Sequence, residues 1–269
     1  MRRLTAMMGT YPKTEPLKSG AVPSPFDFDG IEVAQQGFRN AVRELKYDVT
    51  ELALMTFLMA YEAGGPYVLL PFAMNGGDHH GSILCRAGSE LTPRDLPGKT
   101  VAQRSYAQTT PAWVRGFLAD EYGVRAADVR WLTQEDAHVA EYRDPPWAVR
   151  DDSGRGLDDL LLSGDADAII SGGKRAPDPR IRPLIPDPVT AAVEPVNHIV
   201  AIRREVAASE PETVREVFRL LTAIQDTRPV GFAAVRPALE TAIRYAHEQR
   251  LITKRYAVDD LYGPVADAL

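Results

Sequence analysis

The chain has 269 residues, 45% of them hydrophobic and 25% charged, a composition typical of a globular protein that buries one large core or two modest ones. A formal net charge of -6 and a pI near 5.5 leave no basic surplus for phosphate binding, so we expect neither a nucleic acid nor a membrane as partner. The start of the chain is too poor in apolar residues for a secretion signal, and no run approaches the roughly 18 apolar residues of a membrane span. With Cys85 as the single cysteine, an internal disulfide is excluded, and we expect a cytoplasmic protein.

In the first third of the chain, short apolar runs alternate with amphipathic segments. The runs predict strands at Leu4–Met8, Ile31–Val33, Tyr47–Val49, Tyr67–Phe72 and Ser82–Arg86. Apolar residues at three- and four-residue steps predict helices at Phe38–Leu45 and Glu51–Glu62, and Tyr11–Leu17 predicts a turn or a short helix. This alternation favours an α/β protein with mostly parallel sheets.

The rest of the chain continues the alternation and ends in helices. Pro111 and Gly123 bracket a helix at Ala112–Tyr122, as proline at the first turn and glycine after the last turn usually do. Further strands are predicted at Val129–Leu132, Ala166–Ile170 and Val196–Arg203, a long surface loop at Gln134–Gly156, and helices at Pro211–Gln225 and Pro237–Gln249. We place one crossing between two lobes after residue 92 and the return crossing at Val196.

Several segments together resemble the 4,5-dihydroxyphthalate decarboxylase family. They are Tyr47–Phe57, Asp95–Gln103, Thr109–Val124, Gly164–Ser171, Asn197–Val206 and Leu239–Pro264, of which AWVRGFLADEYGV and RYAHEQ are the most specific. The resemblance implies an intracellular protein with the type II periplasmic-binding-protein fold, in which mixed, mostly parallel sheets form two lobes. Lobe 1 would comprise residues 1–92 and 196–269 and lobe 2 residues 93–195, with a small polar or anionic metabolite in the cleft between them.

Three residues are candidates for acid/base catalysis. His80 and His198 match family histidines, one after a glycine-rich loop and the other in the strand that returns to the first lobe. Glu51 follows Val49, where we expect a strand to end and a helix to begin, a usual place for ligand-contacting residues. Each has a structural alternative. His80 would be an exposed loop histidine, His198 a hydrogen-bonded core histidine, and Glu51 an acid that stabilises the start of a helix.

The expected substrate contacts gather before the predicted helix at Ala112–Tyr122, whose free N–H groups and dipole favour an anion. In the resembling family the loop at residues 75–80 brings arginines to the cleft. Here that loop reads NGGDHH, with Gly76 and His79 where those arginines are expected. Lys174 or Arg175 is therefore expected to supply the cation, unless either is simply solvated. The predicted substrate-binding set is Tyr11, Thr56, His79, Ser105, Gln108, Thr109, Thr110, Lys174 and Arg175.

We therefore expect a decarboxylase-like lyase that acts on a small hydroxylated or activated carboxylic acid without a cofactor. The alternative is a binding protein of the same fold without chemistry. A divalent metal held by Asp78, His79 and His80 with His198 or Glu51 is a further alternative, although this spacing is not diagnostic of a metal site. We expect the helical tail Leu239–Leu269 either to form the contact of a homo-oligomer or, as is more common, to pack against its own lobe.

Overall fold

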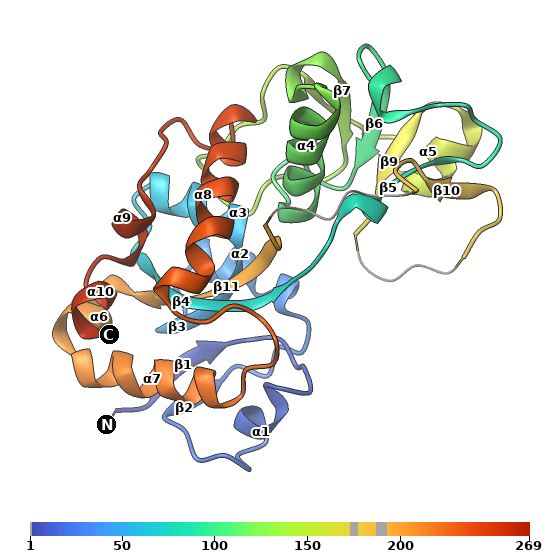
Figure 1. The fold of residues 1–269 in the computed structure, drawn as a ribbon. Helices are drawn as coiled ribbons and strands as arrows, with labels where there is room; N and C mark the ends of the chain where they lie inside the picture. Colours follow the sequence, from blue (N-terminus) through green and yellow to red (C-terminus); the bar gives the residue numbers. More distant parts are fainter. Residues whose placement is uncertain (1, 173–176, 187–192) are drawn as a thin grey trace.

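The computed structural model describes residues 2–172, 177–186 and 193–269, and they form two β-sheets with helices packed around them (Figure 1). The first sheet has the strand order β2-β1-β3-β11-β4. Its strands are β1 (Leu4–Met7), β2 (Phe26–Phe28), β3 (Val49–Ala53), β4 (Tyr67–Gly76) and β11 (Val196–Arg203). β1 pairs in parallel with β2 and β3, whereas β11 runs antiparallel to β3 and β4, so the sheet is mixed.

The second sheet has the order β10-β5-β9-β6-β7-β8 and is also mixed. Its strands are β5 (Ile83–Arg86), β6 (Thr100–Gln103), β7 (Arg130–Thr133), β8 (Ala148–Arg150), β9 (Ala168–Ile170) and β10 (Ile181–Pro183). β6, β7, β8 and β9 are joined in parallel, and β5 runs antiparallel to β9 and β10. The buried Cys85 lies in β5, as expected for a small core residue.

Ten α-helices and four short 3-10 turns connect these strands in the described parts of the chain. The helices are α1 (Glu15–Lys18), α2 (Phe38–Arg43), α3 (Leu54–Glu62), α4 (Thr109–Tyr122), α5 (Leu157–Ser163), α6 (Arg204–Ser209), α7 (Pro211–Ala223), α8 (Phe232–Glu248), α9 (Val258–Tyr262) and α10 (Val265–Ala268). The 3-10 turns are η1 (Ala34–Gln36), η2 (His80–Ser82), η3 (Pro93–Asp95) and η4 (Ala126–Asp128).

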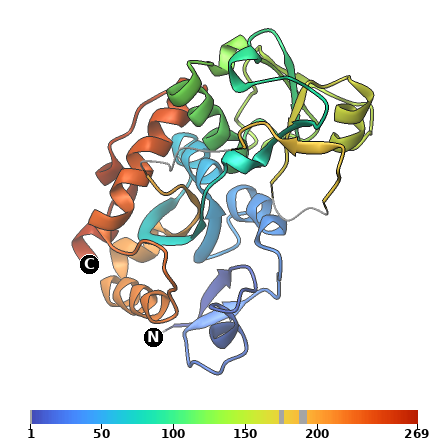
Figure 2. The ribbon, with the colours of Figure 1, turned by 45° about the vertical axis from the view of Figure 1, so that its right-hand side comes forward.

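α4 and α8 lie side by side in Figures 1 and 2 and join the two sheets. Gly116 permits this approach, because a Cβ atom there would lie 2.1 Å from the ring of Tyr245 on α8. The Tyr245 hydroxyl then donates to Asp120 of α4. One continuous apolar core therefore runs through both sheets, from Leu4 in β1 to Val101 in β6.

Two features of the predicted architecture are wrong. Ile31–Val33 is not a strand: the second strand is Phe26–Phe28, which pairs with β1 in parallel. Glu51 lies inside β3 and not at the start of a helix, because β3 continues to Ala53 between β1 and β11. Its role as a helix-start acid is thereby excluded.

The sheets show where the chain first crosses between them. β5 pairs with β9 and β10, so the chain enters the second sheet before Ile83 and not after residue 92. The return coincides with β11, which begins at Val196 as predicted. The lobe bounds, 1–92 with 196–269 for lobe 1 and 93–195 for lobe 2, stay a prediction.

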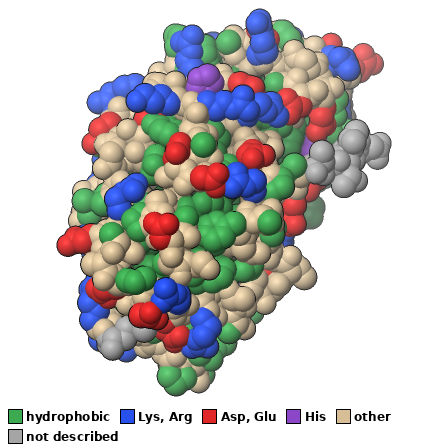
Figure 3. Space-filling model, turned by 60° about the vertical axis from the view of Figure 1, so that its left-hand side comes forward, with side chains coloured by type: hydrophobic (Ala, Val, Ile, Leu, Met, Phe, Trp, Pro, Cys, Tyr) green, Lys and Arg blue, Asp and Glu red, His purple; other side chains and the backbone are tan. Residues whose placement is uncertain are grey.

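Within the described residues no helix is both long enough and apolar enough to cross a membrane. On the face drawn in Figure 3, Lys and Arg side chains gather toward the top, the end of the molecule at which α4 and α8 finish in Figure 1. Asp and Glu side chains are frequent lower on the same face.

Candidate functional site

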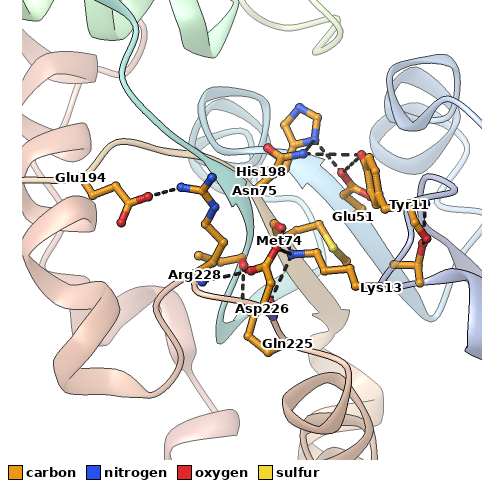
Figure 4. Close-up of polar contacts among 12 residues, drawn as sticks. Tyr11, Lys13, Glu51, Met74, Asn75, Glu194, His198, Gln225, Asp226 and Arg228 are labelled. Carbon is orange, nitrogen blue, oxygen red and sulfur yellow. Dashed lines mark hydrogen bonds and ion pairs between the residues drawn. The ribbon is translucent and has the colours of Figure 1, made fainter.

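A buried carboxylate accepts hydrogen bonds from three separate parts of the chain (Figure 4). Glu51 Oε2 accepts from the backbone N–H of Gly9 at 2.9 Å. Glu51 Oε1 accepts from the Tyr11 hydroxyl at 2.7 Å and lies 2.5 Å from His198 Nδ1. Glu51 is fully buried and His198 is 4% exposed, so these bonds form away from bulk water. The structure thus brings together three of the predicted site residues.

Strand register explains why these residues meet. Glu51 lies opposite Val200 and His198 opposite Ala53, so the two side chains emerge on the same face of neighbouring antiparallel strands. β4 pairs with the other edge of β11, and there Asn75 lies opposite His198. Tyr11 follows the end of β1, the remaining neighbour of β3.

The hydrogen bonds assign the His198 tautomer. Nδ1 is closer to the Glu51 carboxylate, at 2.5 Å, than to Asn75 Nδ2, at 3.0 Å, so Nδ1 carries the proton that Glu51 accepts. No described residue forms a hydrogen bond with Nε2, and Phe38 packs edge-on against the ring with centroids 5.1 Å apart. Burial and the Glu51 charge raise the pKa of Tyr11, which keeps its phenolic proton.

A second polar group lies where the starts of α3 and α4 meet. The Thr109 hydroxyl accepts from the backbone N–H of Met55, one of the free N–H groups in the first turn of α3, at 3.1 Å. Thr56, on the same helix, lies 3.0 Å from His138 Nδ1. Phe38 also packs against His138, with centroids 5.7 Å apart, and so contacts both His138 and His198.

Two histidines near this site are held neutral. Burial, together with charge repulsion from Arg39, Arg104, Arg43 and His198, lowers the pKa of His138 from 6.5 to about 4. Burial likewise lowers the pKa of His79 to about 4. Among the described residues, His79 Nε2 has no hydrogen-bond partner. Both rings are therefore neutral at pH 7.

This predicts a loss of stability in mild acid. Because the pKa of His79 and of His138 is depressed in the folded state, the unfolded chain binds more protons below pH 6.5. The folded state keeps its full stability above pH 6.5, and we expect stability to fall between pH 6.5 and about 4. Urea unfolding midpoints measured across this range test it. A double variant with His79→Gln and His138→Gln should show a shallower slope, and an unchanged slope contradicts the assignment.

His80 lies apart from the Glu51–His198 pair. Its ring stacks on Phe117 of α4 with centroids 4.0 Å apart, Nε2 is 2.7 Å from Glu121, and Nδ1 contacts Asp78. Both ring nitrogens are therefore occupied, and the flanking carboxylates raise the pKa of His80 against the opposing effect of burial. Its predicted acid/base role stays a prediction, and the contacts favour a structural role.

The remaining predicted contacts surround the start of α4. Ser105 is buried and lines a cavity of about 10 Å³ together with Gln108 and His138. With its amide oriented to satisfy both groups, Gln108 accepts from the Arg104 guanidinium at 2.8 and 3.1 Å. The Thr110 side chain lies beside Gly172, 3.8 Å from where a Cβ would be. Lys174 and Arg175 lie outside the described residues.

Arginine at position 76 is incompatible with this backbone. A Cβ on Gly76 would lie 2.1 Å from the carbonyl oxygen of Pro195, because β4 and β11 remain paired up to this residue. The charge repulsion on His138 indicates that Arg39, Arg43 and Arg104 lie near this group instead. Arg43 donates to the carbonyl oxygens of residues 137 and 138, which leaves its charge without a carboxylate partner among the described residues.

No group of three His, Cys, Asp or Glu side chains in the described ranges is arranged to hold a metal ion. The alternative metal site is not assembled, because His80 bonds to Asp78 and Glu121 while His198 bonds to Glu51.

Sequence reasoning missed three residues of this region. His138 lies in a segment without periodicity, and Asn75 was taken as the start of a loop although β4 extends to Gly76. Lys13 follows Tyr11 by two positions, and its ammonium donates to the Met74 carbonyl, to Gln225 and to Asp226 (Figure 4). Burial lowers the pKa of Lys13. The polar spacing Tyr-x-Lys after a buried strand was the available signal.

Two mixed sheets, the crossings between them and the helix starts that meet at their junction define a two-lobed α/β protein of the type II periplasmic-binding-protein kind. The solved structures agree. The alkanesulfonate-binding protein SsuA from Xanthomonas axonopodis pv. citri, bound to MOPS, superposes with a TM-score of 0.65 at 16% identity over 98% of each chain. A mutant of the desulfurization enzyme DSZB in complex with biphenyl-2-sulfinic acid gives a TM-score of 0.57 at 14% identity, covering 100% of this chain and 99% of that chain.

Among curated proteins, the chain is similar to the 4,5-dihydroxyphthalate decarboxylase of Comamonas testosteroni. The two are 29% identical over 238 residues, which cover 78% of this chain and 70% of the relative. The resemblance indicated by the sequence motifs is thereby confirmed. No family profile matches the chain.

Proposed function

We propose that this protein is a cytoplasmic, decarboxylase-like lyase that acts on a small hydroxylated or otherwise activated carboxylic acid. The observation that carries the proposal is the buried Glu51 carboxylate, shared by His198 Nδ1 and the Tyr11 hydroxyl. A carboxylate that fixes one nitrogen of an imidazole leaves the other nitrogen oriented for proton transfer. The decarboxylase name of a relative supports this reaction class.

The proposed reaction needs one proton and no cofactor. The C–C bond to the carboxylate breaks, carbon dioxide leaves, and the electron pair stays on the carbon, which takes a proton from His198 Nε2. His198 recovers this proton from solvent. Glu51 stabilises the imidazolium before the transfer and holds its ring afterwards. Tyr11 donates to the same carboxylate oxygen and so keeps Glu51 in place.

The substrate carboxylate is proposed to lie where the first turns of α3 and α4 meet. Free N–H groups and the two helix dipoles favour an anion there. Thr109 already bonds across this junction, and Thr56 and Ser105 border it. Arg39 and Arg43 of α2 are proposed to attract the acid, in place of the arginines that the loop at residues 75–80 lacks.

The second candidate is a binding protein without turnover, which rests on the fold. SsuA of X. axonopodis binds alkanesulfonates, and a small anion held between two lobes would use the same helix starts. In that case Glu51 and His198 would only position a ligand. A homo-oligomer through the tail 239–269 stays a prediction under either candidate.

Substitution of His198 distinguishes the two candidates. We expect His198→Gln to lower carbon dioxide release from a substrate acid by about 100-fold or more, since a positioned proton donor typically contributes 10²- to 10⁴-fold. Ligand affinity, measured by calorimetry, should change little. His247→Gln, at an exposed position of α8, is the matched control and should leave both unchanged. If the wild type binds hydroxylated aromatic or aliphatic acids from a panel but turns none of them over, the protein is a binding protein and the lyase proposal is wrong.

A further inference from the structure

A cavity of about 400 Å³ lies away from the Glu51–His198 pair, where α4 and α8 end. This volume is in the range of small-molecule sites. Its wall comes from α4, η4, the segment around Trp147 and the end of α8. The lining residues are Arg115, Gly116, Ala119, Arg125, Ala126, Ala127, Trp147, Glu248, Gln249 and Arg250. None of them takes part in the proposed lyase site.

Arg115 is a buried cation in the wall of this cavity. Its side chain is 1% exposed and donates to Gln249 at 2.8 Å, Gln103 at 2.9 Å and the Tyr106 carbonyl at 2.7 Å. Within the described parts of the chain, no carboxylate lies within ion-pair distance of it. A guanidinium has five N–H groups, so two remain available. Burial lowers the pKa of Arg115, and the negative charge of Asp144, which lies beyond ion-pair distance, offsets this effect only in part.

Neutral partners lower that cost but do not remove it. The guanidinium lies 3.9 Å from the Tyr106 ring centroid and 5.4 Å from that of Trp131, a cation–π arrangement. Gln249 and Gln103 present neutral amide oxygens. A bound anion would add a negative charge closer to Arg115 than Asp144 is.

The rim adds an aromatic face and a second free cation. Arg250 lies over the Trp147 ring at 4.8 Å and has no carboxylate partner among the described residues. Arg125, by contrast, is engaged by Asp128 at 2.8 Å. Gly116, Ala119, Ala126 and Ala127 make part of the wall flat and apolar. The basic end of the face in Figure 3 lies at this end of the molecule.

We propose that this cavity is a second binding site for a small amphipathic monoanion, an aromatic carboxylate by class. Its apolar part would lie against Trp147 and Ala119, and its carboxylate would pair with Arg250 at the entrance, with the buried charge of Arg115 behind it. Glu248 at the rim disfavours a second negative charge on the ligand. The proposal is independent of the lyase reaction.

The three tryptophans of the chain allow a direct test with benzoate as the probe. In 5-fluorotryptophan-labelled protein, the fluorine resonance of Trp147, assigned with Trp147→Phe, should shift saturably with benzoate. Benzamide, the neutral isostere, should shift it only at about tenfold higher concentration or above, by loss of the charge-assisted hydrogen bonds. Trp113, whose indole donates to the Val196 carbonyl at the return crossing, reports binding between the lobes instead.

Two variants decide whether the shift arises in the cavity. Ala119→Leu should abolish the Trp147 shift by filling the cavity, and Arg250→Gln should weaken benzoate binding about tenfold. Arg219→Gln, at a paired arginine of α7 outside the cavity, should leave the affinity unchanged. If Ala119→Leu does not fold, the exposed Arg250→Gln decides alone. An unmoved Trp147 resonance, a shift of Trp113 only, or an affinity that neither variant changes overturns the proposal.

Discussion

Replacing Glu51 with glutamine is expected to lower turnover about 10³- to 10⁴-fold, the loss seen when a carboxylate that orients a catalytic histidine becomes an amide. Three donors converge on this side chain: Gly9 N–H, the Tyr11 hydroxyl and His198 Nδ1. Glutamine keeps one acceptor oxygen but directs an NH₂ group at one of the donors. If the NH₂ group replaces Oε1, His198 and Tyr11 lose their acceptor, and His198 loses its fixed tautomer. If it replaces Oε2, the Gly9 N–H loses its acceptor. Initial rates of carbon dioxide release measure the effect.

The control for this variant is another carboxylate that accepts several hydrogen bonds. Glu62 ends α3 and accepts from the backbone N–H groups of Thr253 and Lys254. Glu62→Gln should reduce stability slightly and leave turnover unchanged. A Glu51→Gln enzyme that retains turnover within tenfold of the wild type would remove Glu51 from the reaction, since the shared carboxylate is what carries the proposal.

The sequence predicts the meeting of Glu51, Tyr11 and His198, although for an incomplete reason. Glu51 was expected at a strand end, whereas it lies inside β3, and it meets His198 through the register of β3 with β11. Pairing between strands separated by more than a hundred residues leaves no local signal in the chain. His198 was identified through the family resemblance, because hydrophobic periodicity does not distinguish a functional histidine from a structural one.

His138 and the placement of β5 show the other limit. His138 reaches Thr56 because a segment without regular structure passes α3, and no periodic pattern marks such a segment. β5 has the apolar run of any buried strand, and only its pairing with β9 and β10 assigns it to the second sheet. Strand existence is local information, whereas the choice of sheet is tertiary.

A substitution at His80 distinguishes a catalytic role of this histidine from a structural one. Its ring is fully buried against Phe117 and lies between Asp78 and Glu121. We expect His80→Gln to lower the free energy of unfolding by roughly 2 to 4 kcal/mol, because breaking a buried charged pair leaves Glu121 uncompensated. Asp78 is half exposed, and its contact contributes the smaller share. Urea unfolding at pH 6 measures the loss.

The sign of the pH dependence separates this effect from that of His138. The pKa of His80 is raised in the folded state, so its contribution is complete below pH 6.5 and is lost as the pH rises through the folded pKa. The stability difference between wild type and His80→Gln should therefore shrink above neutral pH. Turnover of the folded fraction should be retained. If His80→Gln abolishes turnover without changing the unfolding midpoint, His80 is the proton donor that the sequence predicted. His198 would then only position the substrate.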